Sequence, residues 1–428
     1  MPAPMKLLQP TQYDDFHCIG ADCEDTCCDG WGITVDRLTY AKYQECPDAE
    51  LRPALQRLVT ISPSNTGDDD YAAFKLTETH CPFLSGGLCS IQSKLGEDYL
   101  SNTCATYPRI MNLVGGTLER TLDLSCPEAA RVILLHPASL EFLEATDSRP
   151  AFRIGNPSVP DSPDSNHDGA HPHFYETRNL VEFILRDPSH LIWQRLLILG
   201  HFCDKLNETL MLQDDANTVN LVQSYRLAVQ NHSFDDLLRK TPPNPTTQLL
   251  VILELIVSRI TTDFTGRHFL DCYREFMEGL EWTQESGLTE ITSRYAEAFS
   301  SYFTPLMALH PFLQERYLVN YVYKNLFPFG RLETNRRSGL HHIRNSVSIQ
   351  CVLLVAYYAI IRTVLIGMAR FHKSAFGIGQ AIKLIHSCTK AFQHSTTFPL
   401  RAIEILNRNG LQSAASTVLL VRDPSVPA

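Results

Sequence analysis

The cysteines of this chain are concentrated near its N-terminus. Nine of the 13 fall within the first 126 residues, and two of them, Cys27 and Cys28, are adjacent. Thiolates held close together in a reducing compartment usually bind a soft metal. The spacing therefore predicts a metal site whose ligands come from eight cysteines: Cys18, Cys23, Cys27, Cys28, Cys81, Cys89, Cys104 and Cys126.

The spacing leaves the identity of the metal open between iron and zinc. Zinc favours tetrahedral sets of four thiolates built from short knuckles, and the chain has no C-x2-C pair. Iron–sulfur clusters also take four thiolates and accept irregular spacings. The C-x3-C-x2-C pattern of radical S-adenosylmethionine enzymes is half present, because Gly30 occupies the place of its third cysteine. Eight thiols exceed one cluster, so some are structural or a second metal is bound.

Disulfides and free core thiols are the other interpretations of these cysteines. The cysteine count is odd, and residues 1–9 lack the apolar stretch of a secretory signal. Both observations favour a reduced, cytosolic protein over a secreted disulfide scaffold. The cysteines outside the predicted ligand set are expected to be free thiols in the core. They are Cys46, Cys203, Cys272, Cys351 and Cys388.

Two glycine pairs predict tight turns near the cysteines. Gly86-Gly87 follows Ser85 between Cys81 and Cys89, so a turn there would bring these two side chains together. Gly115-Gly116 joins residues 110–114 to residues 117–124, which predicts a β-hairpin.

Two short helices are predicted beside the same cysteines. Ser90 is expected to cap a helix through Leu95. Pro127 suits the first turn of a helix through Leu134, which places Cys126 at the N-cap. The helix dipole at that position should lower the pKa of the Cys126 thiol.

Composition divides the chain into three regions. Residues 1–135 form the predicted cysteine-rich metal-binding module, and residues 136–174 form a linker or long surface loop rich in Pro, Asp, Ser and His. Residues 175–428 are predicted to be a helical domain, because apolar residues recur there at helical spacing. The predicted fold class is α+β and predominantly α-helical, with hairpins confined to the small module.

Charge and hydropathy exclude two kinds of partner. The net charge of −10 disfavours nucleic-acid binding, which normally needs a basic patch. The longest apolar run, residues 351–368, is nearly long enough to span a bilayer but contains Arg362. We therefore predict a buried helix there and no membrane partner.

Three segments resemble the bacterial flagellin lysine-N-methylase family. They are FHCIGADCEDTCCDGWGITVD at residues 16–36, CPFLSGGLCSIQSKLGEDYLSNTCATYPR at residues 81–109 and ERYLVNYVYKNLFPF at residues 315–329. The N-terminal part is also similar to the broader family of cysteine-rich, zinc- or iron-chelating domains.

The resemblance implies an enzyme that methylates lysine ε-amines of flagellin, with S-adenosylmethionine as the methyl donor. It also implies a [4Fe-4S] cluster held by the N-terminal cysteines, with zinc as the alternative, and a location in the bacterial cytoplasm. None of these expectations follows from composition or spacing. Two other functions fit the residues, a non-catalytic zinc- or iron-binding interaction protein and a thiol-based redox or metal sensor.

The sequence carries no familiar motif for the methyl donor. It has no G-x-G-x-x-G turn, and Asn231-His232-Ser233 matches a SET-domain motif without the residues that should follow. Tyr107 and Arg109, after Cys104, could serve the donor or the cluster, or be a turn tyrosine and a surface arginine.

A lysine ammonium is commonly bound by aromatic faces and oxygens. Tyr317, Asn320, Tyr321 and Tyr323 could line such a cage, but Tyr317 and Tyr321 are also spaced as one packed helix face. We therefore assign no catalytic or donor-binding residue.

Overall fold

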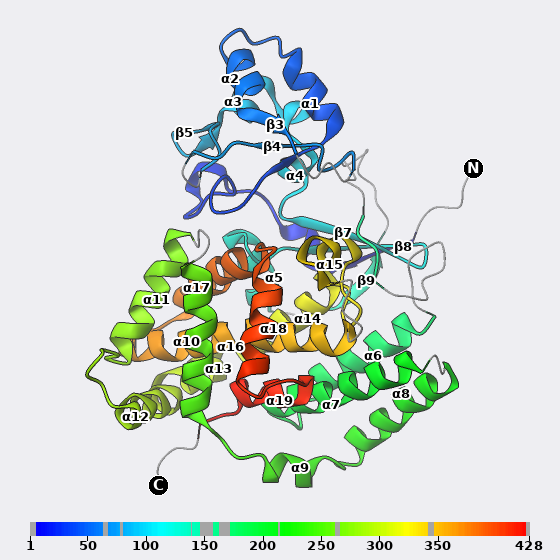
Figure 1. The fold of residues 1–428 in the computed structure, drawn as a ribbon, viewed down its shortest axis with the longest axis vertical. Helices are drawn as coiled ribbons and strands as arrows, with labels where there is room; N and C mark the ends of the chain where they lie inside the picture. The colour runs from blue at the N-terminus through cyan, green and yellow to red at the C-terminus, as the bar shows by residue number, and fades with distance from the viewer. Residues whose placement is uncertain are drawn as a thin grey trace.

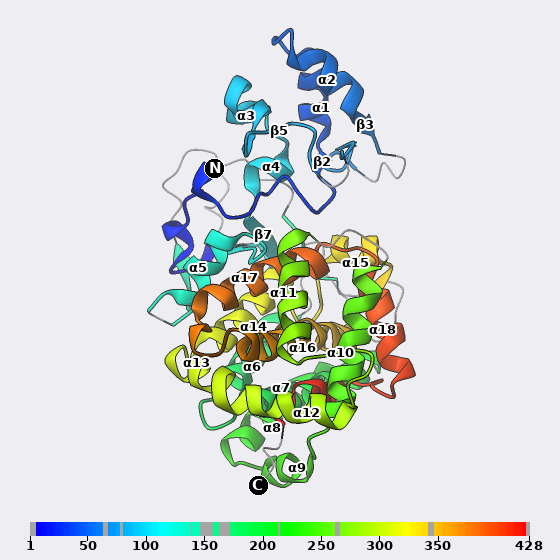
Figure 2. The ribbon, with the colours of Figure 1, turned by 90° about the vertical axis from the view of Figure 1, so that its left-hand side faces the viewer.

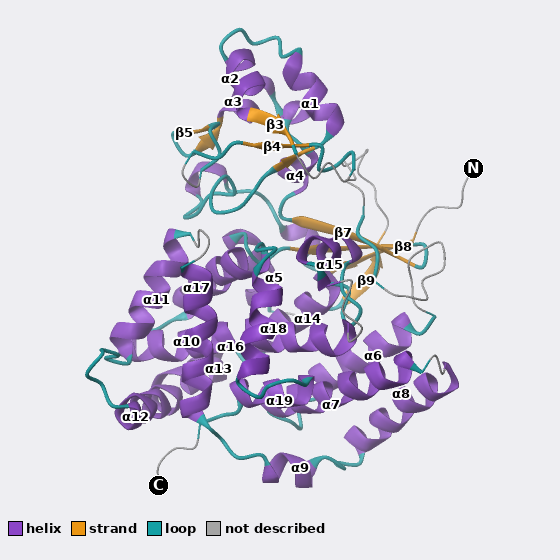
Figure 3. Ribbon diagram, viewed as in Figure 1, coloured by secondary structure: helices purple, strands orange, loops and turns teal. Residues whose placement is uncertain are grey.

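Helices dominate the structure, and strands are few and short (Figure 3). The computed structural model describes residues 6–62, 67–77, 80–137, 139–145, 157–161, 172–212, 215–261, 266–340 and 346–424. A small lobe, residues 28–104, stands above a large helical body (Figures 1 and 2). The predicted α+β class with a majority of helix is confirmed.

The small lobe has a hydrophobic core of its own. That core contains Val35, Tyr43, Leu55 and Phe74, together with the buried cysteines Cys28, Cys46 and Cys81. A three-stranded antiparallel sheet crosses the lobe in the order β2 (Thr34–Val35), β4 (Ala72–Phe74), β3 (Val59–Ile61). Four short helices surround it: α1 (Arg37–Gln44), α2 (Leu51–Leu58), α3 (Ser90–Leu95) and α4 (Asn102–Thr106).

The predicted turn between Cys81 and Cys89 is confirmed. Strands β5 (Leu84–Ser85) and β6 (Leu88–Cys89) pair across Gly86 and Gly87, which both have positive φ. Helix α3 begins directly afterwards, but Ser90 does not cap it. Cys89 occupies the N-cap, and the Ser90 hydroxyl donates instead to the Phe83 carbonyl at 2.8 Å, because the hairpin brings that acceptor within reach.

A second sheet lies against the helical body. Its strand order is β7 (Arg109–Val114), β8 (Thr117–Leu122), β1 (Lys6–Pro10), β9 (Phe142–Ala145). Strands β7 and β8 form the predicted hairpin across Gly115-Gly116, and β1 pairs with β8 in parallel. The predicted helix after Cys126 is also present as α5 (Pro127–Leu135), with Pro127 in its first turn.

The segment 136–174, predicted as a linker or long surface loop, contributes to this sheet. It carries β9, and it forms isolated β-bridges from Ser158 to Asn112 and from Pro160 to Arg331. Residues 146–156 and 162–171 lie outside the described residues. The boundaries at 135 and 175 stay predictions.

The helical body is built around one large hydrophobic core. The apolar residues that recur at helical spacing lie there in long helices such as α10 (Pro245–Ile260) and α16 (Ser346–His372). Its helices after α5 are α6 (Phe174–Leu185), α7 (Ile192–Met211), α8 (Asp215–Gln230), α9 (Asp235–Lys240), α10 (Pro245–Ile260), α11 (Arg267–Gly279), α12 (Leu288–Ala298), α13 (Thr304–Leu309), α14 (Leu313–Lys324), α15 (Leu332–Ser338), α16 (Ser346–His372), α17 (Ile378–Cys388), α18 (Phe398–Arg408) and α19 (Ala414–Thr417).

Helix α16 passes through the centre of this body (Figure 2). Among the described residues, one helix, Val347–Ala375, is long and apolar enough to cross a membrane, and its apolar window is entirely buried within the protein. Arg362 inside it is also buried, pairs with Asp423 and packs on the rings of Phe299 and Phe303. The prediction of a buried helix at residues 351–368 is therefore confirmed.

A buried ion pair joins the second sheet to the helical body. Both nitrogens of the Arg178 guanidinium fork, on α6, donate to the Glu119 carboxylate of β8 at 2.6 Å. Both side chains are only 2% exposed. Because bidentate pairs are directional, this contact fixes the orientation of α6 relative to the sheet.

The cysteines outside the predicted ligand set are core residues, as expected. Cys203 and Cys351 are buried and interact with each other between α7 and α16. Cys272 and Cys388 are buried in the same core, and Cys46 is buried in the small lobe.

Candidate metal centre

The eight predicted ligands come from five separate pieces of chain. Cys18, Cys23, Cys27 and Cys28 lie in the loop before β2, and Cys81 precedes β5. Cys89 ends β6, Cys104 lies in α4, and Cys126 caps α5. All eight are free thiols, so each is available as a ligand.

Five of these thiols gather on the side of the small lobe that faces the helical body. We call Cys27, Cys28, Cys81, Cys89 and Cys104 the five-thiol group. The Cys28 thiol is hydrogen-bonded to those of Cys27 and Cys81, and the Cys28 carbonyl accepts from the Cys81 amide at 2.7 Å. Cys89 and Cys104 lie close enough to each other and to Cys27 that a thiolate at one of them would raise the pKa of its neighbours.

The other three cysteines form a second group. Cys126 interacts with Cys23 and Cys18, and Cys23 with Cys18. Tyr107 lies near both groups, because Cys126 and Cys27 both contribute to raising the pKa of its hydroxyl. The structure thus divides the eight predicted ligands into five and three.

The expected low pKa at Cys126 is wrong for the isolated protein. Burial raises the pKa of this thiol to about 12, although amides of the first turn of α5 lower it. Burial also raises the pKa of Cys104 to about 12 and that of Cys89. A buried thiol without a positive charge stays protonated, because the thiolate loses its hydration. A cation would favour the thiolate form.

The spacing of the thiols can be compared with the ligand spacing around one zinc ion and around a larger cluster. In the part of the chain that the structure describes, no three cysteine sulfurs all lie within 4.8 Å of one another. Sulfurs on one tetrahedral zinc ion, at Zn–S distances of about 2.3 Å, would be roughly 3.8 Å apart. Four thiolates around a four-iron cluster lie farther apart than that. The hydrogen bonds of the Cys28 thiol to Cys27 and Cys81 keep some of these sulfurs close, so the five-thiol group is compatible with either metal.

Aromatic rings cover the sulfur groups on the side of the helical body. The indole of Trp31 donates to the Cys27 carbonyl at 3.0 Å, and its ring lies 5.6 Å from Tyr107 and 5.0 Å from His394. Burial raises the pKa of the Tyr107 hydroxyl, which lies 3.0 Å from that of Ser125. The prediction that Tyr107 lies beside the thiols therefore agrees with its position, whereas Arg109 packs on Phe16.

A lysine of the helical body holds the cysteine loop. Lys390, in the π-helical turn Thr389–Gln393 after α17, lies 3.0 Å from the Asp25 carboxylate and donates to the Thr26 carbonyl at 2.7 Å. His386 lies 3.7 Å from the same carboxylate. Burial lowers the pKa of His386 to about 4, so its ring is neutral. Because Lys390 and Asp25 are both buried, this contact fixes the loop between Cys23 and Cys27 against α17.

A chain of polar contacts runs from the thiols into the helical body. Ser125 lies 3.0 Å from His394, which lies 3.3 Å from Asp123. Asp123 pairs with Lys324 at 3.0 Å, and Lys324 donates to Gln393. Burial disfavours the Asp123 charge, but Lys324 and His394 hold its pKa well below the usual range.

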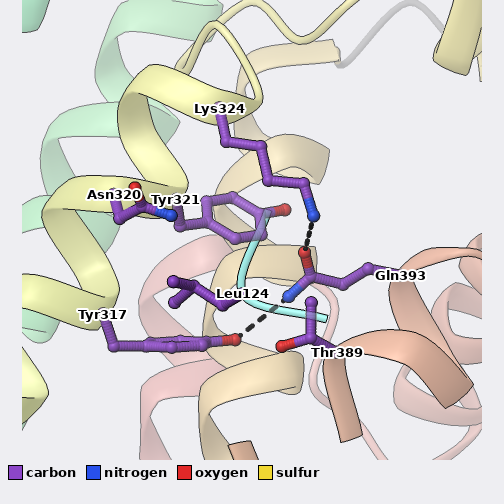
Figure 4. A pocket seen from close by; sticks show the side chains of 7 residues that line it. All are labelled: Leu124, Tyr317, Asn320, Tyr321, Lys324, Thr389 and Gln393. Atoms are coloured by element: carbon purple, nitrogen blue, oxygen red, sulfur yellow. Dashed lines mark hydrogen bonds between the residues drawn. The ribbon is translucent and has the colours of Figure 1, made fainter. Parts of the chain in front are cut away.

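This series of polar contacts ends at a small cavity between α14 and the turn after α17 (Figure 4). Gln393 donates to the Tyr317 hydroxyl at 3.2 Å and lies between Tyr317 and Lys324. The cavity has room for about one water molecule. It is lined by Leu124, Tyr317, Asn320, Tyr321, Lys324, Thr389 and Gln393.

The hypothesis of a four-residue lysine cage is wrong in part. Tyr317 and Tyr321 line the cavity, but they also pack on Tyr358 and Tyr357 of α16 as one helix face. Asn320 is occupied by contacts to Thr121 and Leu122 of β8. Tyr323 points elsewhere, because its hydroxyl donates to Glu182 at 2.6 Å. One side of α14 therefore serves packing.

Sequence reasoning missed the residues of the helical body that contact the cysteine loop. Asp25 lies between two cysteines in the sequence and could have been noticed. Lys390 and His394 are more than 360 residues from that loop and sit in an ordinary helical stretch, so no local pattern distinguishes them.

The fold and the site define a helical protein whose small lobe carries a group of free thiols. Residues 178–420, more than half of the chain, match the FliB lysine N-methylase C-terminal domain. The chain therefore belongs to the FliB lysine N-methylase family, which confirms the resemblance drawn from its segments.

Individual relatives come from Salmonella. The lysine-N-methylases of Salmonella choleraesuis (strain SC-B67) and Salmonella typhimurium (strain LT2) are each 32% identical over 149 residues, 34% of this chain. The chain spans only 37% of the length of these two relatives. The flagellar biosynthetic protein FliU of Salmonella muenchen is 33% identical over 137 residues, 31% of this chain and 80% of that protein. No solved structure matches the chain.

Proposed function

We propose that the protein transfers methyl groups from S-adenosylmethionine to lysine ε-amines of flagellin. Membership of the FliB lysine N-methylase family is the observation that carries this proposal. Two relatives are named for lysine methylation and a third for flagellar biosynthesis, which favours a flagellar protein as substrate. This substrate would place the enzyme in the bacterial cytoplasm, before flagellin is exported.

The proposed cofactor is a [4Fe-4S] cluster held by four cysteines of the five-thiol group. The support is the donor set, which consists of thiols only, together with the resemblance of the cysteine segments to the family. When bound, such a cluster supplies either a ligation point for the amino-acid end of the donor or one-electron transfer. Cys18, Cys23 and Cys126 provide three thiols, one fewer than a site with four thiolate ligands needs.

The residues around the thiols include a cation that favours the thiolate form of Cys27. Lys390 brings a cation close to Cys27 and lowers the pKa of that thiol, against the opposing effects of Cys28 and burial. The rings of Trp31, Tyr107 and His394 pack together beside the thiols.

The test combines metal analysis with a direct assay of methylation. Protein purified without oxygen should contain iron and inorganic sulfide, and flagellin incubated with it and the donor should gain the mass of methyl groups on lysine. Iron without added methyl mass would overturn the methylase and favour a metal-binding interaction protein. Reversible thiol oxidation without methylation would favour the sensor. Zinc without iron would overturn the cluster.

A further inference from the structure

Two histidines and an aspartate converge at the far end of the helical body from the thiols. His190 lies in the loop between α6 and α7, and His232 and Asp235 flank the turn between α8 and α9. One ligand atom of each residue lies within 4.8 Å of the others. The Asp235 carboxylate is 3.9 Å from His190 Nε2 and 3.9 Å from His232 Nδ1.

The burial and hydrogen bonding of His190 distinguish this group from an ordinary surface cluster. Its side chain is only 4% exposed, and its Nδ1 lies 2.6 Å from the Asp187 carboxylate. Nδ1 therefore carries the proton and donates to Asp187, which leaves the lone pair on Nε2. That buried Nε2 has no hydrogen-bond partner and faces His232 and Asp235. A buried acceptor without a donor is costly, so the site needs a positive partner there.

The same arrangement is common around protein-bound metals. A histidine that ligates a metal usually donates its other ring nitrogen to a carboxylate, which fixes the tautomer. Ligand atoms about 2.0–2.2 Å from one zinc ion would be roughly 3.3–3.5 Å apart in a tetrahedron. The two observed distances of 3.9 Å to Asp235 exceed this by about half an ångström, and the two histidine nitrogens lie within 4.8 Å of each other. His232 and Asp235 are exposed, so their side chains can move to close the difference.

We propose that His190, His232 and Asp235 bind a divalent cation of the zinc type, with water in the remaining position. Two imidazoles and one carboxylate suit zinc, whereas calcium and magnesium prefer oxygen ligands alone. The ion would tie the α6–α7 loop to the α8–α9 turn. Asp187 is a positioning residue that orients His190. This site shares no residue with the thiol groups.

The test compares zinc binding by full-length variants. The exposed ligands are removed in His232→Ala and Asp235→Ala, and His310→Ala is the control because it lies in another loop. Equilibrium dialysis against Zn²⁺ with elemental analysis gives the zinc content per chain. Zinc taken up by the thiols is common to all variants and cancels in the comparison.

We expect the wild type and His310→Ala to bind one zinc per chain more than the two ligand variants. Loss of a ligand should weaken this site at least about tenfold. Added zinc should also raise the melting temperature of the wild type and the control more than that of the ligand variants. Equal zinc contents in all four proteins would overturn the proposal.

Discussion

The thiol of Cys28 is hydrogen-bonded to two other thiols, those of Cys27 and Cys81, and its charge interacts with that of Cys89. Removing its sulfur should therefore disrupt the five-thiol group most directly. We expect Cys28→Ser to lose most of the bound iron and the methylation of flagellin, because a hydroxyl is a poor ligand for soft metals. Iron and sulfide analysis of oxygen-free protein measures the first effect, and mass spectrometry of flagellin the second.

Cys46 provides the control for this prediction. It is buried in the same small lobe, but its sulfur contacts the Asp48 carbonyl and belongs to neither thiol group. Cys46→Ala should keep its iron and lose about 1 kcal/mol of stability through the small cavity that it creates. Full iron content in Cys28→Ser, or equal iron loss in both variants, would contradict the assignment of the site.

Lys390 does not belong to the thiol groups, but it neutralises the buried carboxylate of Asp25. In Lys390→Met the side chain keeps its bulk, but Asp25 and the Thr26 carbonyl lose their donor. Leaving a buried charge without its partner costs about 3–5 kcal/mol. We expect the loop at residues 23–28 to detach from α17, which limited proteolysis and hydrogen exchange would detect.

Lys383→Met is the matched control for this change. Lys383 lies on α17 and pairs with Glu275, but this pair is more exposed and does not touch the cysteine loop. The Lys383→Met substitution should change the free energy of unfolding by no more than about 1 kcal/mol and leave the cysteine loop protected from proteolysis and hydrogen exchange. Equal protection of the loop in both variants would show that Lys390 does not hold it.

At the scale of elements, α11 and α16 cross at two glycines. A Cβ atom added at Gly279 would lie 2.1 Å from the Gly367 carbonyl oxygen. A Cβ atom at Gly367 would lie 2.4 Å from the Phe276 ring. Backbones can approach this closely only without side chains, so glycine is required for close packing here.

Alanine at these positions should separate the two helices. We expect Gly279→Ala and Gly367→Ala each to lower the free energy of unfolding by at least about 1–3 kcal/mol. Gly379→Ala on α17 is the control, since no atom lies within 4 Å of the added Cβ. It should be neutral or stabilise by up to about 1 kcal/mol. Urea unfolding measures all three, and an undiminished stability of Gly279→Ala would refute the close contact.

Local signals were enough for several elements. Gly86-Gly87 and Gly115-Gly116 marked two turns, and Pro127 marked the start of α5. The prediction for Ser90 failed because capping depends on which acceptor lies nearby, and the β5–β6 hairpin brings the Phe83 carbonyl to it. A cap is thus less certain from sequence than a turn that requires positive φ.

At the scale of the whole molecule, a large core in the helical body contrasts with a much smaller one in the lobe. The small lobe has few fully buried side chains, whereas the helical body extends its core through α16. Four of the five thiols, Cys28, Cys81, Cys89 and Cys104, belong to the small core or pack against it, so a bound cluster would cross-link it. Metal binding of this kind contributes directly to folding.

Removing the metal should therefore loosen the small lobe alone. On the proposed function, we expect chelation to speed hydrogen exchange in residues 28–104 at least about tenfold, or about 1.4 kcal/mol of local stability. Helix α16 should stay protected, because its burial does not depend on the thiols. Exchange that is unchanged in the lobe, or that rises equally in α16, would contradict this division.

The sequence by itself determined the helical majority, the hairpins, the core cysteines and the family. These depend on short-range spacing and on residue types that are visible in a single segment. Only the tertiary structure decided how eight cysteines divide into five and three, and that Lys390 reaches Asp25 across 365 positions. It also decided that burial outweighs the helix dipole at Cys126. Such contacts depend on how distant segments pack, and hydration is lost only when they do.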